Sequence, residues 1–167
     1  MPTAPTPTLT SLNLDGPLAV AGSPAACFAR LWQRLWSQPY VTPELLELCR
    51  LTLARLHCDE EELAARNPHV PPGAPSPERR DRVLAGDTAS PLFSEHERAV
   101  LAFTEVYGLD AQSITDELAA RVSDQLGEAG LVFLIEALGC LDGRIRVARC
   151  LRDLSAAADG PEGTHVR

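Results

Sequence analysis

The sequence predicts an all-α protein, built as one compact domain of about seven helices. Apolar residues recur at the three- and four-residue spacing of amphipathic helices, and no segment alternates apolar and polar residues with a period of two. Ser-Pro and Thr-Pro pairs, which favour helix starts, precede several of these segments. The 167 residues, with 45% apolar content, are enough for one domain with its own core.

The first expected helix spans residues 23–38. A Ser-Pro pair opens it, with the serine as cap and the proline at the first helical position, and Pro39 ends it. Its apolar face carries Trp32 and Trp36. Such an aromatic stripe is either a ligand platform or, more commonly, part of a core or a subunit contact, so it assigns no site by itself.

Two further helices surround the most acidic part of the chain. Residues 42–57 begin with Thr-Pro-Glu and carry a leucine-rich face, and a short helix over residues 59–66 follows directly. Asp59 and Glu62 have the D-x-x-E spacing of a capping box, and an Asn-Pro pair stops this helix. A proline-rich loop comes next.

The next two expected helices span residues 76–86 and 94–108. The first begins with Ser-Pro-Glu and ends at a glycine. The second has the clearest start in the chain, because Ser94 and Glu97 form an S-x-x-E capping box, and Gly108 is expected to close it.

Two helices complete the fold, over residues 113–126 and 129–155, with Gly127 between them. The last helix is long and apolar. Gly139 and Gly143 lie four residues apart within it, so we expect that another helix can approach this face closely.

These elements divide the chain into three parts. The helical domain is expected to span residues 23–155. The Pro/Thr-rich residues 1–22 and the small, polar residues 156–167 are expected to be flexible segments on either side of it.

Charge and composition exclude several classes of partner. The net charge of -8 and the absence of a basic face argue against binding to nucleic acid or to an anionic membrane surface. No apolar run is long enough for a membrane span, and the N-terminus lacks the basic region of a secretory signal, so we expect a cytoplasmic protein.

The five cysteines are therefore expected to be reduced thiols. Their spacing fits no disulfide framework, and no C-x-x-C or H-x-x-x-H pair of a zinc site is present, so we expect no metal and no cofactor. Most of them are expected to be small core residues. The five are Cys27, Cys49, Cys58, Cys140 and Cys150.

Three segments, in this order, resemble the alkyl hydroperoxidase D and carboxymuconolactone decarboxylase superfamily: ELCRLTLARLHCDEE, SPLFSEHERAVLAFTE and EALGCLDGRIRVARCL. The resemblance covers residues 28–152. It implies an all-helical fold that assembles into dimers, trimers or hexamers, and an activity related to peroxidases or decarboxylases.

The peroxidase branch of this superfamily has the motif E-x(11)-C-x-x-C-x-x-x-H, in which the glutamate and the histidine relay protons to the cysteines. Without gaps, Glu47 takes the place of the glutamate. Asp59 and Glu62 take the places of the two cysteines, and Arg66 that of the histidine. The family's Asn-Arg pair is Gly-Arg here, ending at Arg144. Most of the redox motif is therefore replaced.

The acids of residues 59–62 are explained by the stabilisation of a helix start alone. They also place negative charge beside Cys58, which disfavours a thiolate, so Cys58 is expected to be a poorer nucleophile than a free cysteine. Loss of both motif cysteines favours a non-redox member, either a pocket for a small molecule or an oligomeric scaffold. One alternative is a residual one-cysteine peroxidase that acts through Cys58 with an external thiol.

The other alternative is carboxylate chemistry, as in the decarboxylase branch. Glu47 and Glu62 would then carry the catalysis, with Glu47 as general base, although Glu47 could equally be salt-bridged to Arg50 or Arg66. The substrate would be a small anion held by Arg66 or Arg144. The residues expected to line the site are His57, Asp59, Arg66 and Arg144.

Overall fold

The structure is a computed structural model that describes residues 8–158, and every regular element in that range is helical. The prediction of an all-α fold with seven α-helices is confirmed for this part of the chain. The helices are α1 (Asp15–Leu18), α2 (Ser23–Leu35), α3 (Pro43–Leu56), α4 (Glu60–Ala64), α5 (Pro77–Leu84), α6 (Glu95–Asp110) and α7 (Asp116–Ala158), with short 3-10 turns η1 (Ala19–Ala21) and η2 (Ala111–Ser113).

The predicted helix starts at Thr42, Asp59 and Ser94 are confirmed, because each side chain accepts a hydrogen bond from the backbone N–H three residues further on. The capping box at Ser94 has both of its hydrogen bonds. The expected cap at Ser23 is wrong: Gly22 occupies the capping position of α2, and no side chain caps this helix.

Two glycines were expected to end helices, Gly108 in α6 and Gly127 in α7, and only the second does so. Gly108 does not close α6, which continues to Asp110. A Cβ atom on Gly108 would lie only 2.6 Å from the side chain of Leu56, so the glycine lets α3 and α6 approach each other. Gly127 has φ 73° and ψ 169°, which breaks α7 into two straight parts as predicted.

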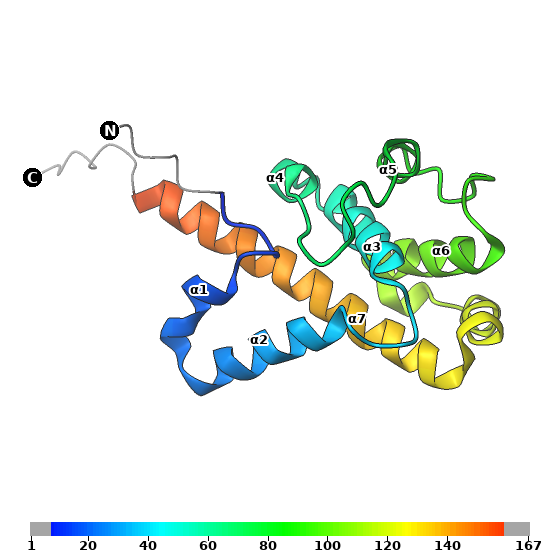
Figure 1. The fold of residues 1–167 in the computed structure, drawn as a ribbon, viewed down its shortest axis with the longest axis horizontal. Helices are drawn as coiled ribbons and strands as arrows, with labels where there is room; N and C mark the ends of the chain where they lie inside the picture. Colours follow the sequence, from blue (N-terminus) through cyan, green and yellow to red (C-terminus); the bar gives the residue numbers. More distant parts are fainter. Residues whose placement is uncertain (1–7, 159–167) are drawn as a thin grey trace, which may run out of the picture.

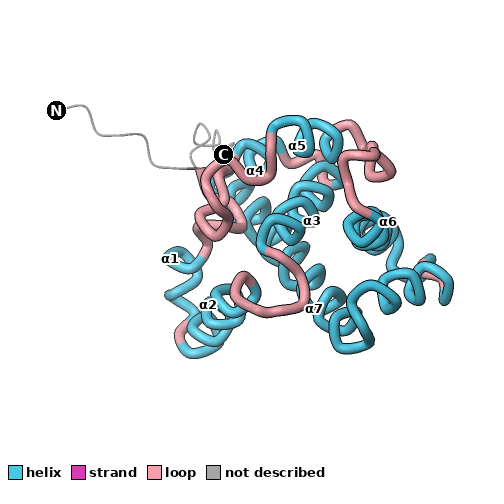
Figure 2. Tube along the Cα trace, turned by 45° about the vertical axis from the view of Figure 1, so that its right-hand side comes forward, coloured by secondary structure: helices cyan, strands magenta, loops and turns pink. Residues whose placement is uncertain are grey.

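Helix α3 lies at the centre of the fold and contacts α4, α5, α6 and α7 (Figure 2). All residues from Leu45 to Ala54 are buried, so this helix is covered on every side. Charged residues of α3, Glu47 and Arg50, are therefore held inside the core. Within residues 8–158, no helix combines the length and the apolar composition needed to cross a lipid bilayer.

Residues 8–22, part of the segment that the sequence predicts to be flexible, pack against the helical domain in the structure. Ser11 and Leu14 are fully buried, and this part of the chain leads into α1 beside the long helix α7 (Figure 1). The backbone carbonyl of Ser11 accepts a hydrogen bond from Arg144 at 2.8 Å, and that of Leu9 accepts one from Arg152 at 2.7 Å. We call residues 8–14 the N-terminal strap. Residues 1–7 and 159–167, the outer parts of the two expected flexible segments, lie outside the described residues.

Candidate functional site

Glu47 and Glu62 bind the same guanidinium group, that of Arg50. The Nε and Nη2 atoms of Arg50 donate to the two carboxylate oxygens of Glu47 at 2.8 and 2.6 Å, because the two residues lie one turn apart on α3. The Nη1 atom donates to the carboxylate of Glu62 at 2.6 Å and to its backbone carbonyl at 2.8 Å. All three side chains are buried. The buried triad thus joins α3 to α4.

Two neutral residues complete the hydrogen bonding of this triad. Asn67 donates to Oε2 of Glu47 at 2.6 Å. The backbone N–H of Ser11 donates to Oε2 of Glu62 at 2.8 Å, and the Ser11 hydroxyl donates to Oε1. Every carboxylate oxygen of Glu47 and Glu62 therefore accepts at least one hydrogen bond, and one of the partners comes from the N-terminal strap.

The electrostatics of the triad keep Arg50 charged. Burial disfavours its charged form, but hydrogen bonding and charge from Glu47 and then from Glu62 outweigh burial and raise the pKa of Arg50 above its usual value. A buried ion group of this kind adds little net stability, but removing one member is strongly destabilising. Of the two roles considered for Glu47, the geometry matches the salt bridge with Arg50, because each carboxylate oxygen already accepts a hydrogen bond from that guanidinium.

Cys58 is exposed at the turn between α3 and α4. Its φ of 51° lies in the left-handed region, and the N–H groups of Cys58 and Asp59 bond to the carbonyls of Arg55 and Ala54, both at 3.0 Å. This is the Schellman pattern, in which a helix end is closed by a left-handed residue that is usually glycine. The conformation of Cys58 is therefore explained by its position at the end of α3. No second cysteine lies three residues away in the sequence, so Cys58 has no C-x-x-C partner.

Cys49 is not placed to assist Cys58. It is fully buried on α3, where the Thr104 hydroxyl donates to its sulfur at 3.3 Å. Burial raises the pKa of Cys49 to about 12, so its thiol stays protonated at physiological pH. All five cysteines are free thiols. The expectation that most of them are core residues is wrong, because Cys27, Cys58 and Cys150 are exposed and only Cys49 and Cys140 are buried.

Asp59 and His57 lie beside the triad but have other partners. One oxygen of Asp59 caps α4, and the other accepts a hydrogen bond from Arg152 of α7 at 2.5 Å. His57 pairs through Nε2 with Asp142, also on α7, at 2.5 Å. Both residues therefore tie the turn between α3 and α4 to α7, and neither touches Glu47.

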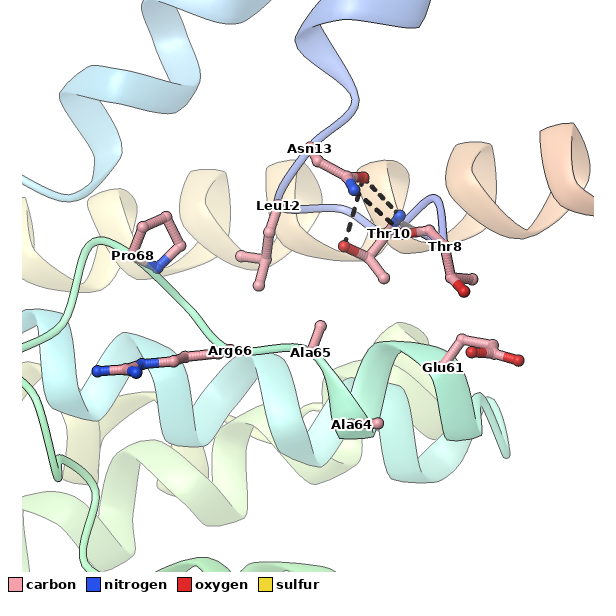
Figure 3. Close-up of a pocket in the computed structure, with 9 residues that line it drawn as sticks. All are labelled: Thr8, Thr10, Leu12, Asn13, Glu61, Ala64, Ala65, Arg66 and Pro68. Carbon is pink, nitrogen blue, oxygen red and sulfur yellow. Dashed lines mark hydrogen bonds between the residues drawn. The ribbon is translucent and has the colours of Figure 1, made fainter. Parts of the chain in front are cut away.

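Two cavities flank the end of α4. One of about 420 Å³ lies between the N-terminal strap and α4, with Leu12 projecting into it from the strap (Figure 3). Its lining residues are Thr8, Thr10, Leu12, Asn13, Glu61, Ala64, Ala65, Arg66 and Pro68. The other, of about 190 Å³, lies under the proline-rich loop and has Glu47 in its wall. The two cavities share Ala64, Ala65 and Arg66.

Arg66 lines both cavities, and Arg80 is a second arginine in the wall of the smaller one. The side chain of Arg66 extends along the wall of the larger cavity toward Pro68, whereas Glu61 lies at the opposite end (Figure 3). Arg66 is exposed and makes no ion pair with any residue in the range 8–158. Its charge is therefore available to a ligand.

Arg144 lies elsewhere, between α7 and the aromatic residues of α2. Its guanidinium is 4.2 Å from the centroid of the Trp32 ring, and its Nη1 atom pairs with Asp15 at 2.8 Å. The lining residues of the described cavities include Arg66 but not Arg144. The structure therefore does not bring these two arginines together on one ligand.

Sequence reasoning did not identify Ser11 and Asn67 as partners of the carboxylates. Glu47 and Arg50 could have been recognised as a buried pair, because the spacing E-x-x-R stands between leucines of an apolar helix. Ser11 gives no such indication, because its partner Glu62 is distant in the sequence. Among residues 8–158, no three His, Cys, Asp or Glu side chains are grouped so that they could hold a metal ion.

No protein-family model, no curated protein and no solved structure matches this chain.

Proposed function

We propose that this chain is a divergent, non-redox member of the alkyl hydroperoxidase D-like superfamily that binds a small anionic molecule beside Arg66. The proposal of family rests on the order of the motif segments and on the placement of Glu47 and Asp59 on consecutive helices. In the redox motif of the superfamily, the position of Glu47 belongs to the glutamate of the proton relay, and that of Glu62 to the second cysteine. Here both side chains are bound to Arg50 instead.

The observation that carries the binding proposal is the position of Arg66 between two cavities. An exposed guanidinium without an ion pair among residues 8–158, next to about 420 and 190 Å³ of space, suits a small anion. The threonines and the asparagine of the N-terminal strap add hydrogen-bonding groups on the opposite side of the larger cavity (Figure 3).

Carboxylate catalysis is the weaker reading of the same residues. Glu47 has a face on the smaller cavity, but both of its oxygens accept hydrogen bonds from Arg50, and Asn67 donates to one of them. A general base needs a free oxygen within hydrogen-bonding reach of the substrate proton. We therefore place binding before catalysis.

A one-cysteine peroxidase is the second candidate, favoured by the exposure of Cys58. The reduced protein and a Cys58→Ser variant are treated with a slight excess of an organic hydroperoxide and followed by intact-mass spectrometry. Oxidation of Cys58 at the rate of a model thiol would remove this candidate, whereas much faster oxidation that the variant lacks would put it first.

The resemblance also leads us to propose a homo-oligomer in the cytoplasm. The groove of about 640 Å³ between α2 and α7, with Leu31 and Phe133 in its walls, is a surface on which another copy could pack. Three exposed thiols suit a reducing compartment. Light scattering coupled to size-exclusion chromatography gives the number of copies, and a strictly monomeric protein would contradict the proposal.

The binding proposal is tested by isothermal titration calorimetry with a panel of small mono- and dicarboxylates. We expect that at least one binds and that Arg66→Gln weakens its binding about tenfold or more, because one charge-assisted hydrogen bond is lost. Arg121→Gln, which removes an exposed arginine from a different surface, is the matched control and should bind as the wild type does. The proposal would be overturned if Arg66→Gln and Arg121→Gln bound the carboxylate with the same affinity, or if the wild type bound no carboxylate of the panel.

A further inference from the structure

Five buried side-chain donors have no acceptor among residues 8–158. Two of them are the Nε atoms of Arg55 and Arg79, whose other nitrogens form ion pairs. The remaining three are the indole Nε1 atoms of Trp32 and Trp36 and the Nη2 atom of Arg144. Their residues are 0%, 6% and 0% exposed, respectively. A buried donor left without a partner is unfavourable, and more so when it carries a charge. Such groups in a native protein point to an acceptor that the polypeptide does not supply.

The three donors belong to one cluster. The rings of Trp32 and Trp36 meet edge to face with centroids 5.2 Å apart, and the Arg144 guanidinium lies 4.2 Å from the Trp32 centroid. Phe28 covers the guanidinium at 5.3 Å, and His69 stacks on Trp36 at 5.2 Å. The cluster therefore joins α2, α7 and the loop that follows Arg66.

The chemistry of the cluster defines what is missing. Indole and guanidinium groups only donate hydrogen bonds, so the absent partner must be an acceptor. Arg144 is the one cation of this cluster, and the Asp15 carboxylate that pairs with it is 38% exposed and therefore partly screened by water. Because this cluster has a single buried guanidinium, a ligand with one negative charge should be bound better than a ligand with two.

We propose that this cluster is a binding site for a small, singly charged oxyanion such as a carboxylate, which accepts hydrogen bonds from Arg144 Nη2 and from the indole groups of Trp32 and Trp36. The apolar part of the ligand would lie against the aromatic rings. Asp15 and His69, which are both partly exposed, mark the side from which the ligand enters. This site is separate from the cavities beside Arg66, whose lining residues include neither tryptophan.

The protein carries its own reporter for this site. Its two tryptophans are both in the cluster, so tryptophan emission, excited selectively over that of the two tyrosines, reports on the cluster. The wild type is titrated with sodium acetate and sodium propionate, and with inorganic phosphate for comparison, at an ionic strength held constant with chloride. We expect a saturable change in tryptophan emission with the carboxylates, stronger for propionate, and a weaker response to phosphate.

Two variants separate the site from a general effect of salt. Trp36→Phe keeps the ring but removes one donor, so the affinity should fall about 2-fold to 10-fold, as for one hydrogen bond. Arg144→Gln should abolish saturation, whereas Arg146→Gln, an exposed neighbour on the same helix, should bind as the wild type does. Circular dichroism checks that each variant is folded, and Trp36→Phe decides the matter if Arg144→Gln does not fold.

Several results would overturn the proposal. One is a wild type whose emission shows no saturable response to either carboxylate, and another is a Trp36→Phe variant with unchanged affinity. Tighter binding of phosphate than of propionate would contradict the single charge. A crystal structure grown in propionate in which ordered water alone satisfies the three donors would also exclude the site.

Discussion

Glu47 on α3 and Glu62 on α4 are held together through the guanidinium of Arg50, although two carboxylates in a protein core would otherwise repel each other. Each glutamate has its own edge of the guanidinium, so the positive charge is shared between two helices. This geometry makes the stability of the fold depend on Arg50 more than on either carboxylate.

Replacement of Arg50 by Met should destabilise the protein by about 3–5 kcal/mol, because two buried carboxylates lose their cation. Urea unfolding followed by circular dichroism measures the change. Adding Glu47→Gln and Glu62→Gln to Arg50→Met should restore most of the loss, because no buried charge is left. A triple variant as unstable as the single one would show that shape, and not charge, fixes the triad.

Cys58→Gly should stabilise the protein by about 1 kcal/mol, because glycine takes a left-handed conformation without the cost that other residues have there. Cys150→Gly is the matched control: this cysteine is also exposed but lies within α7, so glycine should destabilise by about 0.3 kcal/mol. Thermal unfolding of the two variants beside the wild type shows whether the shifts have opposite signs.

The burial of Cys49 predicts a loss of stability in alkaline solution. Its pKa rises from 9.0 to about 12 on folding, so the folded state keeps a proton that the unfolded state loses between these values. The contribution of Cys49 is complete below pH 9, and the free energy of unfolding then falls by about 1.4 kcal/mol per pH unit. Urea unfolding between pH 8 and 10.5 should give a steeper decline for the wild type than for Cys49→Ala. Parallel curves would mean that this thiol ionises in the folded protein.

Ser11→Ala should destabilise the protein by about 1–3 kcal/mol, because the carboxylate of Glu62 loses a buried hydrogen bond. Ser23→Ala is the control, since this exposed serine does not cap α2, and its effect should lie within about 0.5 kcal/mol of zero. Chemical denaturation gives both values, and limited proteolysis shows whether the N-terminal strap is the part that loosens. A large effect of Ser23→Ala would restore the cap that the sequence predicted.

The sequence predicted those features whose causes are local. The caps at Thr42, Asp59 and Ser94 need only residues a few positions apart, so the pattern and the structure agree there. The glycine break at Gly127 is of the same kind.

Features that depend on distant residues could not be predicted in this way. The Pro/Thr-rich composition of the strap predicted a flexible segment. The strap is instead held by hydrogen bonds to Glu62 and Arg144, which lie on other helices and cannot be recognised from the strap's own sequence. Gly108 was expected to end a helix, but its role comes from the approach of Leu56 on α3. For the candidate site, the sequence indicated Glu47, Glu62 and their helices, but not the hydrogen bonds that occupy them.

The strap also fixes an order of events during synthesis. The carbonyl of Ser11 accepts its hydrogen bond from Arg144, which lies 133 residues later in the chain. Because a nascent chain emerges from its N-terminus, Ser11 leaves the ribosome long before Arg144 is made, so this hydrogen bond forms late. The hydrogen bonds from Ser11 to Glu62 span only 51 residues and can form earlier. The strap is therefore completed only when α7 has been made, although its contact with α4 needs a much shorter length of chain.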